Sequence, residues 1–376
     1  PAGRAAIADP QTLRSALVIK ALCFERTGAI AAAATTSLPE APGGVRNWDY
    51  RFTWIRDSVL AARALHALGF VREADRFRAF IERSAAGNAR QLQLMYGVDG
   101  RRRLTELTLD HLEGWRGARP VRVGNAAAEQ SQLDIYGTLL ELAWLWHDHA
   151  QPIDAAYWDF LVDAVDVTCR RWQEPDHGIW EVRDAPRHFV HSKIMCWVAV
   201  DRGIRLAQRH GLAPVERWSL MREHIRDDID RRGYDERLGV YRQSYGETYA
   251  DAALLLVPSF GYLAYDDPRM LRTTEWIRRT LDRDGLLLRY DREDGLPEPE
   301  GAFLPCTFWL VECLAMQGRL EEARRCYDKA AGCANELGLF SEEFARDGSG
   351  MLGNFPQALT HLAQITARLA IDAAAR

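Results

Sequence analysis

Apolar residues recur every three or four positions along almost the whole chain, which is the spacing of one face of an α-helix. Strand signals are short and few, the clearest being 239–243 and 286–290, and no strand–helix alternation is present. The sequence therefore predicts an all-α fold. The expected helices are 13–24, 54–68, 71–81, 135–146, 155–172, 195–207, 215–229, 249–263, 270–281, 303–316, 320–337 and 355–370.

Long loops rich in aromatic and charged residues return about once per two helices. They cover 37–50, 96–129, 175–191, 234–248, 283–304 and 340–354. This rhythm favours a closed toroid of helical pairs with the long loops at one mouth, while an open solenoid would show a sharper repeat. We expect residues 1–30 to form a linker-like segment with the first helix, and residues 31–376 to form one barrel domain.

Composition excludes several classes of function. A net charge of -5 and a pI near 6.1 argue against a nucleic-acid partner, whose phosphates require clustered Lys and Arg. No apolar stretch is long enough to span a membrane. The seven cysteines lack CxxC spacing, which indicates a reducing compartment, and we expect a cytoplasmic protein. No HExxH motif is present, so neither a metal nor an organic cofactor is expected.

The segment 47–57 has an unusual density of aromatic and charged residues where a loop enters a helix. It contains Tyr50, Trp54, Arg56 and Asp57. Sugar sites need such a mixture, because aromatic faces cover the apolar side of a pyranose while charged groups bind its hydroxyls. An ordinary capped helix start with an Arg56–Asp57 surface pair would give the same pattern, and spacing alone does not separate the two.

Two distant loops carry the acidic residues with the clearest chemical potential. Glu181 follows Trp180, and burial of a carboxyl group against an aromatic face favours its protonated form, as a general acid requires. Glu342 and Glu343 lie in another loop. Two carboxyl groups converging on one mouth are the requirement for inverting glycoside hydrolysis, in which one is the acid and the other activates water. Taken singly, each of these residues could equally be an ordinary loop charge.

Together these stretches resemble glycoside hydrolase family 15, the family of glucoamylases, glucodextranases and a group of bacterial and archaeal trehalases. The resemblance covers nearly the whole chain in family order. Its segments are 43–57, 119–125, 129–134, 189–193, 300–304 and 353–357.

The resemblance implies an (α/α)6 barrel with the site at its mouth. It gives Glu181 the role of general acid and Glu342, rather than Glu343, the role of general base. Residues of the first segment would form the floor of the pocket for the terminal glucose, and an arginine would contact sugar near the cleavage point. The implied binding residues are Tyr50, Trp54, Arg56, Asp57, Trp115, Gln132, Asp134, Trp180, His191, Lys193 and Arg289.

The function expected from the resemblance is an inverting, exo-acting glycosidase that releases β-glucose from α-glucosidic oligosaccharides or glucans, as glucoamylases do. The alternative on the same scaffold is an α,α-trehalase. A catalytically silent glycan-binding barrel is a third interpretation, which the retention of both glutamates disfavours. Bacterial members usually carry an N-terminal β-sandwich, so a sandwich or other fused domain absent from this chain is a possible partner.

Overall fold

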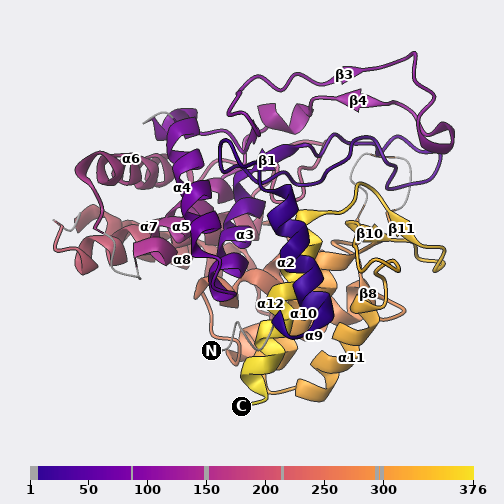
Figure 1. The fold of residues 1–376 in the computed structure, drawn as a ribbon. Helices are drawn as coiled ribbons and strands as arrows, with labels where there is room; N and C mark the ends of the chain where they lie inside the picture. The colour runs from indigo at the N-terminus through magenta and orange to yellow at the C-terminus, as the bar shows by residue number, and fades with distance from the viewer. Residues whose placement is uncertain (1–6, 86–87, 148–151, 213–215, 293–295, 297–299) are drawn as a thin grey trace.

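Helices make up most of the computed structural model, which describes residues 7–85, 88–147, 152–212, 216–292, 296 and 300–376 (Figure 1). Residues 1–6 of the expected N-terminal segment, and Val215 of an expected helix, lie outside the described residues. The helices are α2 (Pro10–Leu22), α3 (Ile55–Ala67), α4 (Val71–Ala85), α5 (Asp134–His147), α6 (Ala155–Arg171), α7 (Val190–Arg209), α8 (Glu216–Arg232), α9 (Pro268–Leu281), α10 (Leu304–Met316), α11 (Leu320–Ala331) and α12 (Ala358–Ala374).

An inner ring of elements closes on itself. Among the described residues, α3 packs on α5, α5 on α7, α7 on the 3-10 helix η4 (Ala252–Leu256), η4 on α10, α10 on α12, and α12 again on α3. The elements between them in sequence pack outside this ring, with α4 on α3, α8 on α7, α9 on η4 and α11 on α10. This alternation of inner and outer elements is an (α/α)6 barrel, so the expected fold class is confirmed.

The inner and outer helices differ in sequence as their positions require. The inner helix α10 is apolar on nearly every side and is buried along almost its whole length. The outer helix α11 buries only Ala323, Tyr327 and Ala330, which follow each other at helical spacing, and it exposes charged residues elsewhere. Helical periodicity therefore identified both kinds of helix, because each buries at least one continuous face.

The fourth inner element is not the α-helix expected over 249–263. Its place is taken by η4 and by η5 (Pro258–Phe260), after which Gly261 has a φ of 73°. Pro258 cannot donate the backbone hydrogen bond that a continuing α-helix needs, and Gly261 in the left-handed region ends the segment. The apolar run 252–257 is fully buried, so its pattern resembled a helix although the backbone forms only short 3-10 turns.

Short antiparallel strands shape the loops at one end of the ring. They are β1 (Phe52–Trp54) with β2 (Met95–Gly97), β3 (Leu107–Thr108) with β4 (Arg122–Val123), β5 (Tyr234–Asp235) with β6 (Val240–Tyr241), β7 (Asp282–Arg283) with β8 (Leu286–Leu287), and the sheet β11 (Met351–Leu352), β10 (Glu343–Phe344), β9 (Ala302–Phe303). Strands β6 and β8 fall within the two segments expected from sequence. The pair β3–β4 forms an arm at the upper edge of Figure 1.

The described helices include none with the length and apolarity needed to cross a membrane.

Two inner helices approach each other closely at Gly137 of α5. A Cβ atom added there would lie 2.2 Å from the carbonyl oxygen of Met195 in α7, so the two backbones approach each other too closely for a side chain. Gly203, on the other side of α7, differs because its nearest neighbour is a methyl group of Val165, at 2.8 Å from the added atom.

We expect Gly137→Ala to lower the free energy of unfolding by about 1 to 3 kcal/mol, the usual range for overpacking a core. The cause is that α5 and α7 must separate. Gly203→Ala is the matched control and should cost less, because a side chain can shift and alanine favours the helix by about 0.5 to 1 kcal/mol. Urea unfolding of both variants measures the difference, and equal losses would contradict the backbone contact.

Candidate active site

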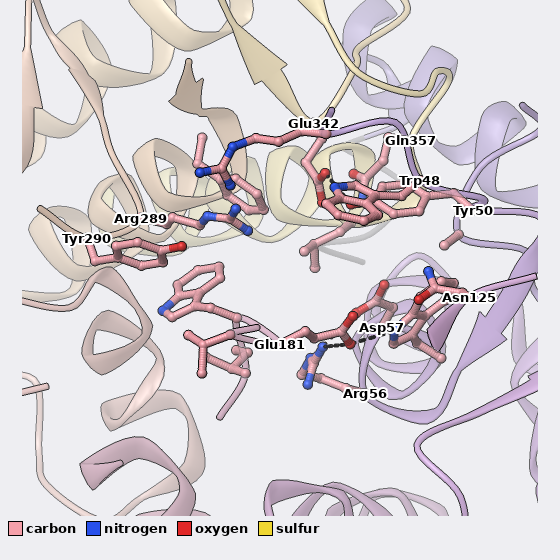
Figure 2. Close-up of a pocket in the computed structure, with 18 of the residues that line it drawn as sticks. Trp48, Tyr50, Arg56, Asp57, Asn125, Glu181, Arg289, Tyr290, Glu342 and Gln357 are labelled. Carbon is pink, nitrogen blue, oxygen red and sulfur yellow. Dashed lines mark hydrogen bonds and ion pairs between the residues drawn. The ribbon is translucent and has the colours of Figure 1, made fainter. Parts of the chain in front are cut away.

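The mouth of the ring holds a pocket lined by aromatic and charged residues, the mixture that small-molecule sites use. Its walls come from the segments that precede or begin the inner elements, so the N-terminal ends of these elements face it. Figure 2 shows Trp48, Tyr50, Gln357 and Glu342 along one side and Glu181, Arg56 and Asp57 along the facing side, with Arg289 and Tyr290 at one end.

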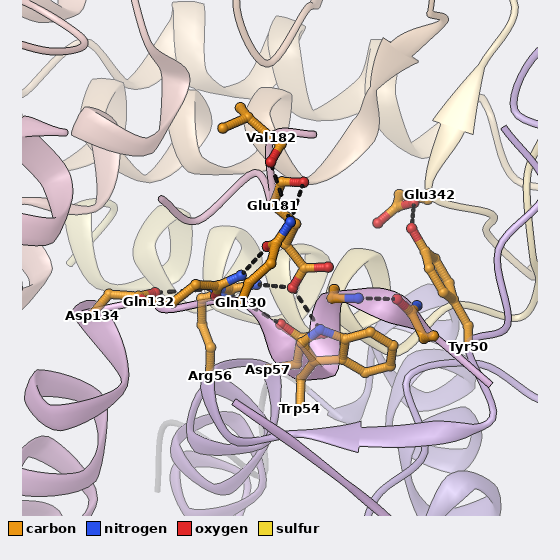
Figure 3. Close-up of polar contacts among 12 residues, drawn as sticks. Tyr50, Trp54, Arg56, Asp57, Gln130, Gln132, Asp134, Glu181, Val182 and Glu342 are labelled. Carbon is orange, nitrogen blue, oxygen red and sulfur yellow. Dashed lines mark hydrogen bonds and ion pairs between the residues drawn. The ribbon is translucent and has the colours of Figure 1, made fainter. Parts of the chain in front are cut away.

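Glu181 is held by two donors from the start of α3. Its Oε1 accepts a hydrogen bond of 2.7 Å from Nε1 of Trp54 and one of 3.3 Å from the guanidinium of Arg56 (Figure 3). The backbone of Glu181 lies in the left-handed region with a φ of 57°. Gln130 fixes that backbone because its Nε2 donates to the carbonyl oxygens of Glu181 and Val182, each at 3.2 Å.

Arg56 is the centre of a polar floor beneath Glu181. Its NH1 donates to Gln132 at 2.9 Å and to Asp134 at 3.1 Å, and its Nε lies 3.8 Å from Asp57. Burial raises the pKa of Asp57 to about 6, against the opposing effect of Arg56. The floor therefore offers both a cation and a carboxyl group to the hydroxyls of a sugar.

Glu342 lies on the facing side and is bound at both oxygens. The hydroxyl of Tyr50 donates to Oε2 at 2.7 Å, and Nε2 of Gln357 donates to Oε1 at 3.3 Å. Burial raises the pKa of Glu342 well above its usual range, and the negative charge of Glu40 acts in the same direction. The neighbouring Glu343 does not line the pocket, because its Oε2 accepts the backbone N–H of Gly301 at 2.8 Å.

Trp180 contributes an aromatic wall rather than a cover for Glu181. Its Nε1 donates to Asp251 at 2.7 Å, and its ring packs against Phe303 and Trp309 at centroid distances of 5.3 and 6.0 Å. The indole that contacts the carboxyl group of Glu181 is that of Trp54. The sequence argument relied on Trp180, the neighbour of Glu181 in the chain, whereas the tryptophan that bonds to this carboxyl group is Trp54.

Arg289 and Glu300 form an ion pair with two parallel hydrogen bonds. The Nε of Arg289 donates to Glu300 at 2.6 Å, and its NH2 binds the other carboxylate oxygen. The same guanidinium lies over the rings of Trp180 and Phe303, at 5.8 and 5.3 Å from their centroids. Arg289 is therefore fixed in position before any ligand arrives.

A cation–aromatic stack forms the outer rim. The ring of Trp48 lies between the guanidiniums of Arg122 and Arg183, at 4.6 and 4.5 Å from its centroid. Glu106 joins the stack because its carboxylate lies 3.2 Å from Arg122 and 3.6 Å from Arg183. Glu106, on the arm that carries β3 and β4, thereby holds Arg183, which lies two positions after Glu181.

Most of the residues expected at the site line this pocket, namely Tyr50, Trp54, Arg56, Asp57, Trp180, Glu181, Arg289 and Glu342. Gln132 and Asp134 lie one layer below and hold Arg56. Three others are not among the lining residues.

His191, Lys193 and Trp115 each lie away from the pocket for a physical reason. His191 is buried, and burial lowers its pKa to about 4, so the ring is neutral. Lys193 turns its Nζ to the carbonyl oxygens of Trp172, at 2.5 Å, and Glu174. Trp115 is 45% exposed on the arm, where Arg116 stacks on it at 4.3 Å.

Several pocket residues were not expected at the site from sequence. Gln357 and Trp48 belong to segments that the sequence already singled out, so their position there was the available signal. Glu40 is not a lining residue but bonds to the lining residues Trp48 and Tyr50; it lies in a Pro- and Gly-containing loop and had no such signal. Other unexpected lining residues are Arg46, Asn125, Arg183, Tyr290, Phe303 and Trp309.

Comparison with known proteins agrees with this architecture. The model of the family glycosyl hydrolases family 15 matches residues 8–369. Curated relatives named trehalase are 46% identical over 361 residues in Mycobacterium tuberculosis and 47% identical over 361 residues in Mycolicibacterium smegmatis. Both alignments cover 94% of this chain, and they cover 53% and 54% of the relatives, so the chain spans about half of their length. A trehalase of Thermoplasma volcanium is 40% identical over 94% of this chain and 57% of its own length.

Solved structures with the same fold are more distant in sequence. A bacterial glucoamylase complexed with acarbose has a TM-score of 0.76 at 16% identity, covering 98% of this chain and 56% of the other. A glycosidase variant in complex with glucose has a TM-score of 0.72 at 19% identity, covering 96% of each chain. Since the family model matches almost the whole chain, this protein belongs to glycosyl hydrolases family 15.

Proposed function

We propose that this chain hydrolyses α,α-trehalose with inversion, with Glu181 as general acid and Glu342 as general base. One observation carries the proposal. Two carboxyl groups from widely separated connections of the barrel lie on facing sides of one pocket, each oriented by hydrogen bonds (Figure 3). That arrangement is what an inverting glycosidase needs, because the acid and the base act on opposite faces of the sugar.

Glu181 is suited to protonate the leaving oxygen. Within the described part of the chain, Trp54 and Arg56 both bind Oε1, so Oε2 is the oxygen that carries the transferable proton. As the bond from C1 to the glycosidic oxygen breaks, this proton moves to that oxygen, and Glu181 becomes a carboxylate. Arg56 then stabilises the new negative charge.

Glu342 is suited to activate water. Tyr50 and Gln357 fix its two oxygens, so the carboxylate keeps one orientation toward the pocket. The water loses a proton to Glu342 as its oxygen bonds to C1 from the face opposite the leaving group. The glucose formed at C1 is therefore the β-anomer, and the departing glucose keeps its own α configuration.

The choice of trehalose over longer glucans rests on the relatives. The sequence favoured a glucoamylase-like activity, whereas the curated relatives at 40 to 47% identity are named trehalases. The rim supports a compact polar leaving group, because Arg183, which pairs with Glu106, brings a charged group to the pocket wall beside Glu181. A second glucose unit presents the hydroxyls that such groups bind.

We expect Glu181→Gln and Glu342→Gln each to lower kcat by at least about 100-fold, the lower end of general acid–base contributions. An amide can neither deliver the proton nor accept one from water. Kinetics on trehalose measures the loss, and Glu312→Gln is the control because Glu312 bonds to Tyr265 at the far end of the barrel. Full activity in either glutamate variant would refute its assigned role. If the unmodified protein cleaves neither trehalose nor maltooligosaccharides, the catalytic proposal fails and the silent glycan-binding barrel replaces it.

We expect kcat/KM for trehalose to exceed that for maltotriose by at least about 100-fold, because polar groups that bind the second glucose remain unpaired when another linkage misplaces its hydroxyls. Glucose release from both sugars under the same conditions measures this ratio. A preference for maltotriose would replace the trehalase proposal by the glucoamylase-like one.

We expect the first-formed products of trehalose cleavage to be α-glucose and β-glucose in equal amounts. Inversion acts on one ring only, while retention would give α-glucose from both. Proton NMR during the first turnovers, before mutarotation, distinguishes the outcomes, and α-glucose alone would exclude an inverting mechanism.

A further inference from the structure

The hydroxyl of Tyr50 lies between two buried carboxyl groups. It is 2.7 Å from Oε2 of Glu342 and 3.2 Å from Oε1 of Glu40. Glu40 is 2% exposed and Glu342 6% exposed, so both carboxyl groups are buried. Because a tyrosine hydroxyl has one proton, it can donate to only one of these groups, and the other contact is a hydrogen bond when that carboxyl group donates.

The charges around this triad do not balance if every carboxyl group is ionised. Oxygens of Glu40, Glu300 and Glu343 lie within 4.8 Å of one another, and Glu342 joins them through Tyr50. Two guanidiniums here, those of Arg46 and Arg289, bind Glu300, and a third, that of Arg122, interacts with the charge of Glu40. Four carboxyl groups against three guanidiniums still leave excess negative charge in a buried place, which is relieved when a carboxyl group retains a proton.

The two distances at Tyr50 indicate which carboxyl group is ionised. The 2.7 Å contact with Glu342 lies where the ranges of charge-assisted and neutral O–H···O bonds meet, whereas the 3.2 Å contact with Glu40 is longer than is usual for either. Of the two contacts, the one with Glu342 is therefore the one that fits a bond to an ionised oxygen. We infer that Glu40 is a positioning residue, which keeps a proton and donates it to Tyr50 so that Tyr50 in turn donates to an ionised Glu342. The inference rests on the proposed role of Glu342 as base.

The other side of Glu40 fits the protonated form. Nε1 of Trp48 donates to Oε2 of Glu40 at 3.1 Å. A protonated Glu40 has one oxygen that accepts from Trp48 and one hydroxyl that donates to Tyr50, so both contacts are satisfied together. A carboxylate could satisfy Trp48, but it would face the lone pairs of Tyr50 while that hydroxyl donates to Glu342.

The surroundings of Glu40 favour the same protonation state. Burial is the main cause that raises the pKa of Glu40 to about 7, and the charge of Glu300 adds to it, whereas Arg289, Trp48 and Arg46 oppose it. Burial raises the pKa of Glu342 as well, so the pKa directions show that this group of acids retains protons, and the geometry at Tyr50 assigns one of them to Glu40. The charged and titratable groups that face the triad from the neighbouring elements are Arg46, Asp57, Arg122, Arg289, Glu300 and Glu343.

The test compares Glu40→Gln with Glu40→Met. Glutamine keeps an acceptor for Trp48 and a donor for Tyr50, and it is neutral like protonated Glu40. Methionine is also neutral but has no such donor. At pH 6 we expect kcat/KM for trehalose to stay within about threefold in Glu40→Gln and to fall at least about tenfold in Glu40→Met, as the loss of a buried hydrogen bond implies.

The pH profile separates a positioning role from a merely structural one. We expect the acidic limb of kcat/KM, where Glu342 ionises, to move by less than about 0.3 pH unit in Glu40→Gln, because the charge near Glu342 does not change. If Glu40 were ionised in the working protein, the substitution would remove a negative charge beside Glu342. The limb would then move to lower pH by about one unit or more, which would overturn the inference.

Infrared difference spectra give a readout that does not depend on turnover. At pH 6 the spectrum of Glu40→Gln should lack one C=O band of a protonated carboxyl group that the unmodified protein shows. An unchanged band in Glu40→Gln would overturn the inference even if Glu40→Met does not fold. An inactive Glu342→Gln with an unchanged band refutes only the role of Glu40, whereas an active Glu342→Gln refutes the proposed function.

Discussion

The packing of α12 against α3 is the contact on which the whole site depends, because it closes the ring. The N–H of Ala358 donates to the carbonyl oxygen of Ala32 at 2.7 Å, and Asn354 donates to the carbonyl oxygen of Trp48 at 2.8 Å. These bonds join the last helical hairpin to the first. Tyr50 and Glu342 are 292 positions apart in the sequence, and in an open solenoid they would belong to opposite ends of the molecule. Ring closure therefore turns two loop residues into neighbours.

The direction of the inner elements is the second constraint on the site. They begin at the same end of the ring, so the positive ends of their helix dipoles face the pocket. Carboxyl groups are less unfavourable there than elsewhere in a protein interior. The effect does not balance the whole group of buried acids, which is why the pKa values of Asp57, Glu40 and Glu342 are all raised. The barrel thus brings the carboxyl groups together, and its helix dipoles stabilise part of their negative charge.

Sequence reasoning identified the helices well and the local chemistry of the site less well. Helical periodicity is a property of each segment alone, so α10 and α11 could be located from their own residues. The segment 249–263 failed because burial on all sides makes a 3-10 turn resemble a helix, although Pro258 was visible. The segment 47–57 identified the floor of the pocket correctly, because its aromatic and charged residues are close together in the sequence itself. Three features of the site depend on which distant segments meet, and one sequence does not contain that information. They are the position of Glu40, the hydrogen bond from Trp54 to Glu181, and the hydrogen bond from Lys193 to the carbonyl oxygen of Trp172.

The backbone of Glu181 has a further consequence for how the barrel tolerates change. A residue with a side chain in the left-handed region costs about 1 to 3 kcal/mol, and glycine would avoid that cost. Gln130 holds the strained turn in place from outside it. Selection for stability alone would therefore favour glycine at this position and remove the acid. The glutamate persists against the preference of its own backbone, so thermostable variants obtained without an activity screen should be checked at this residue first.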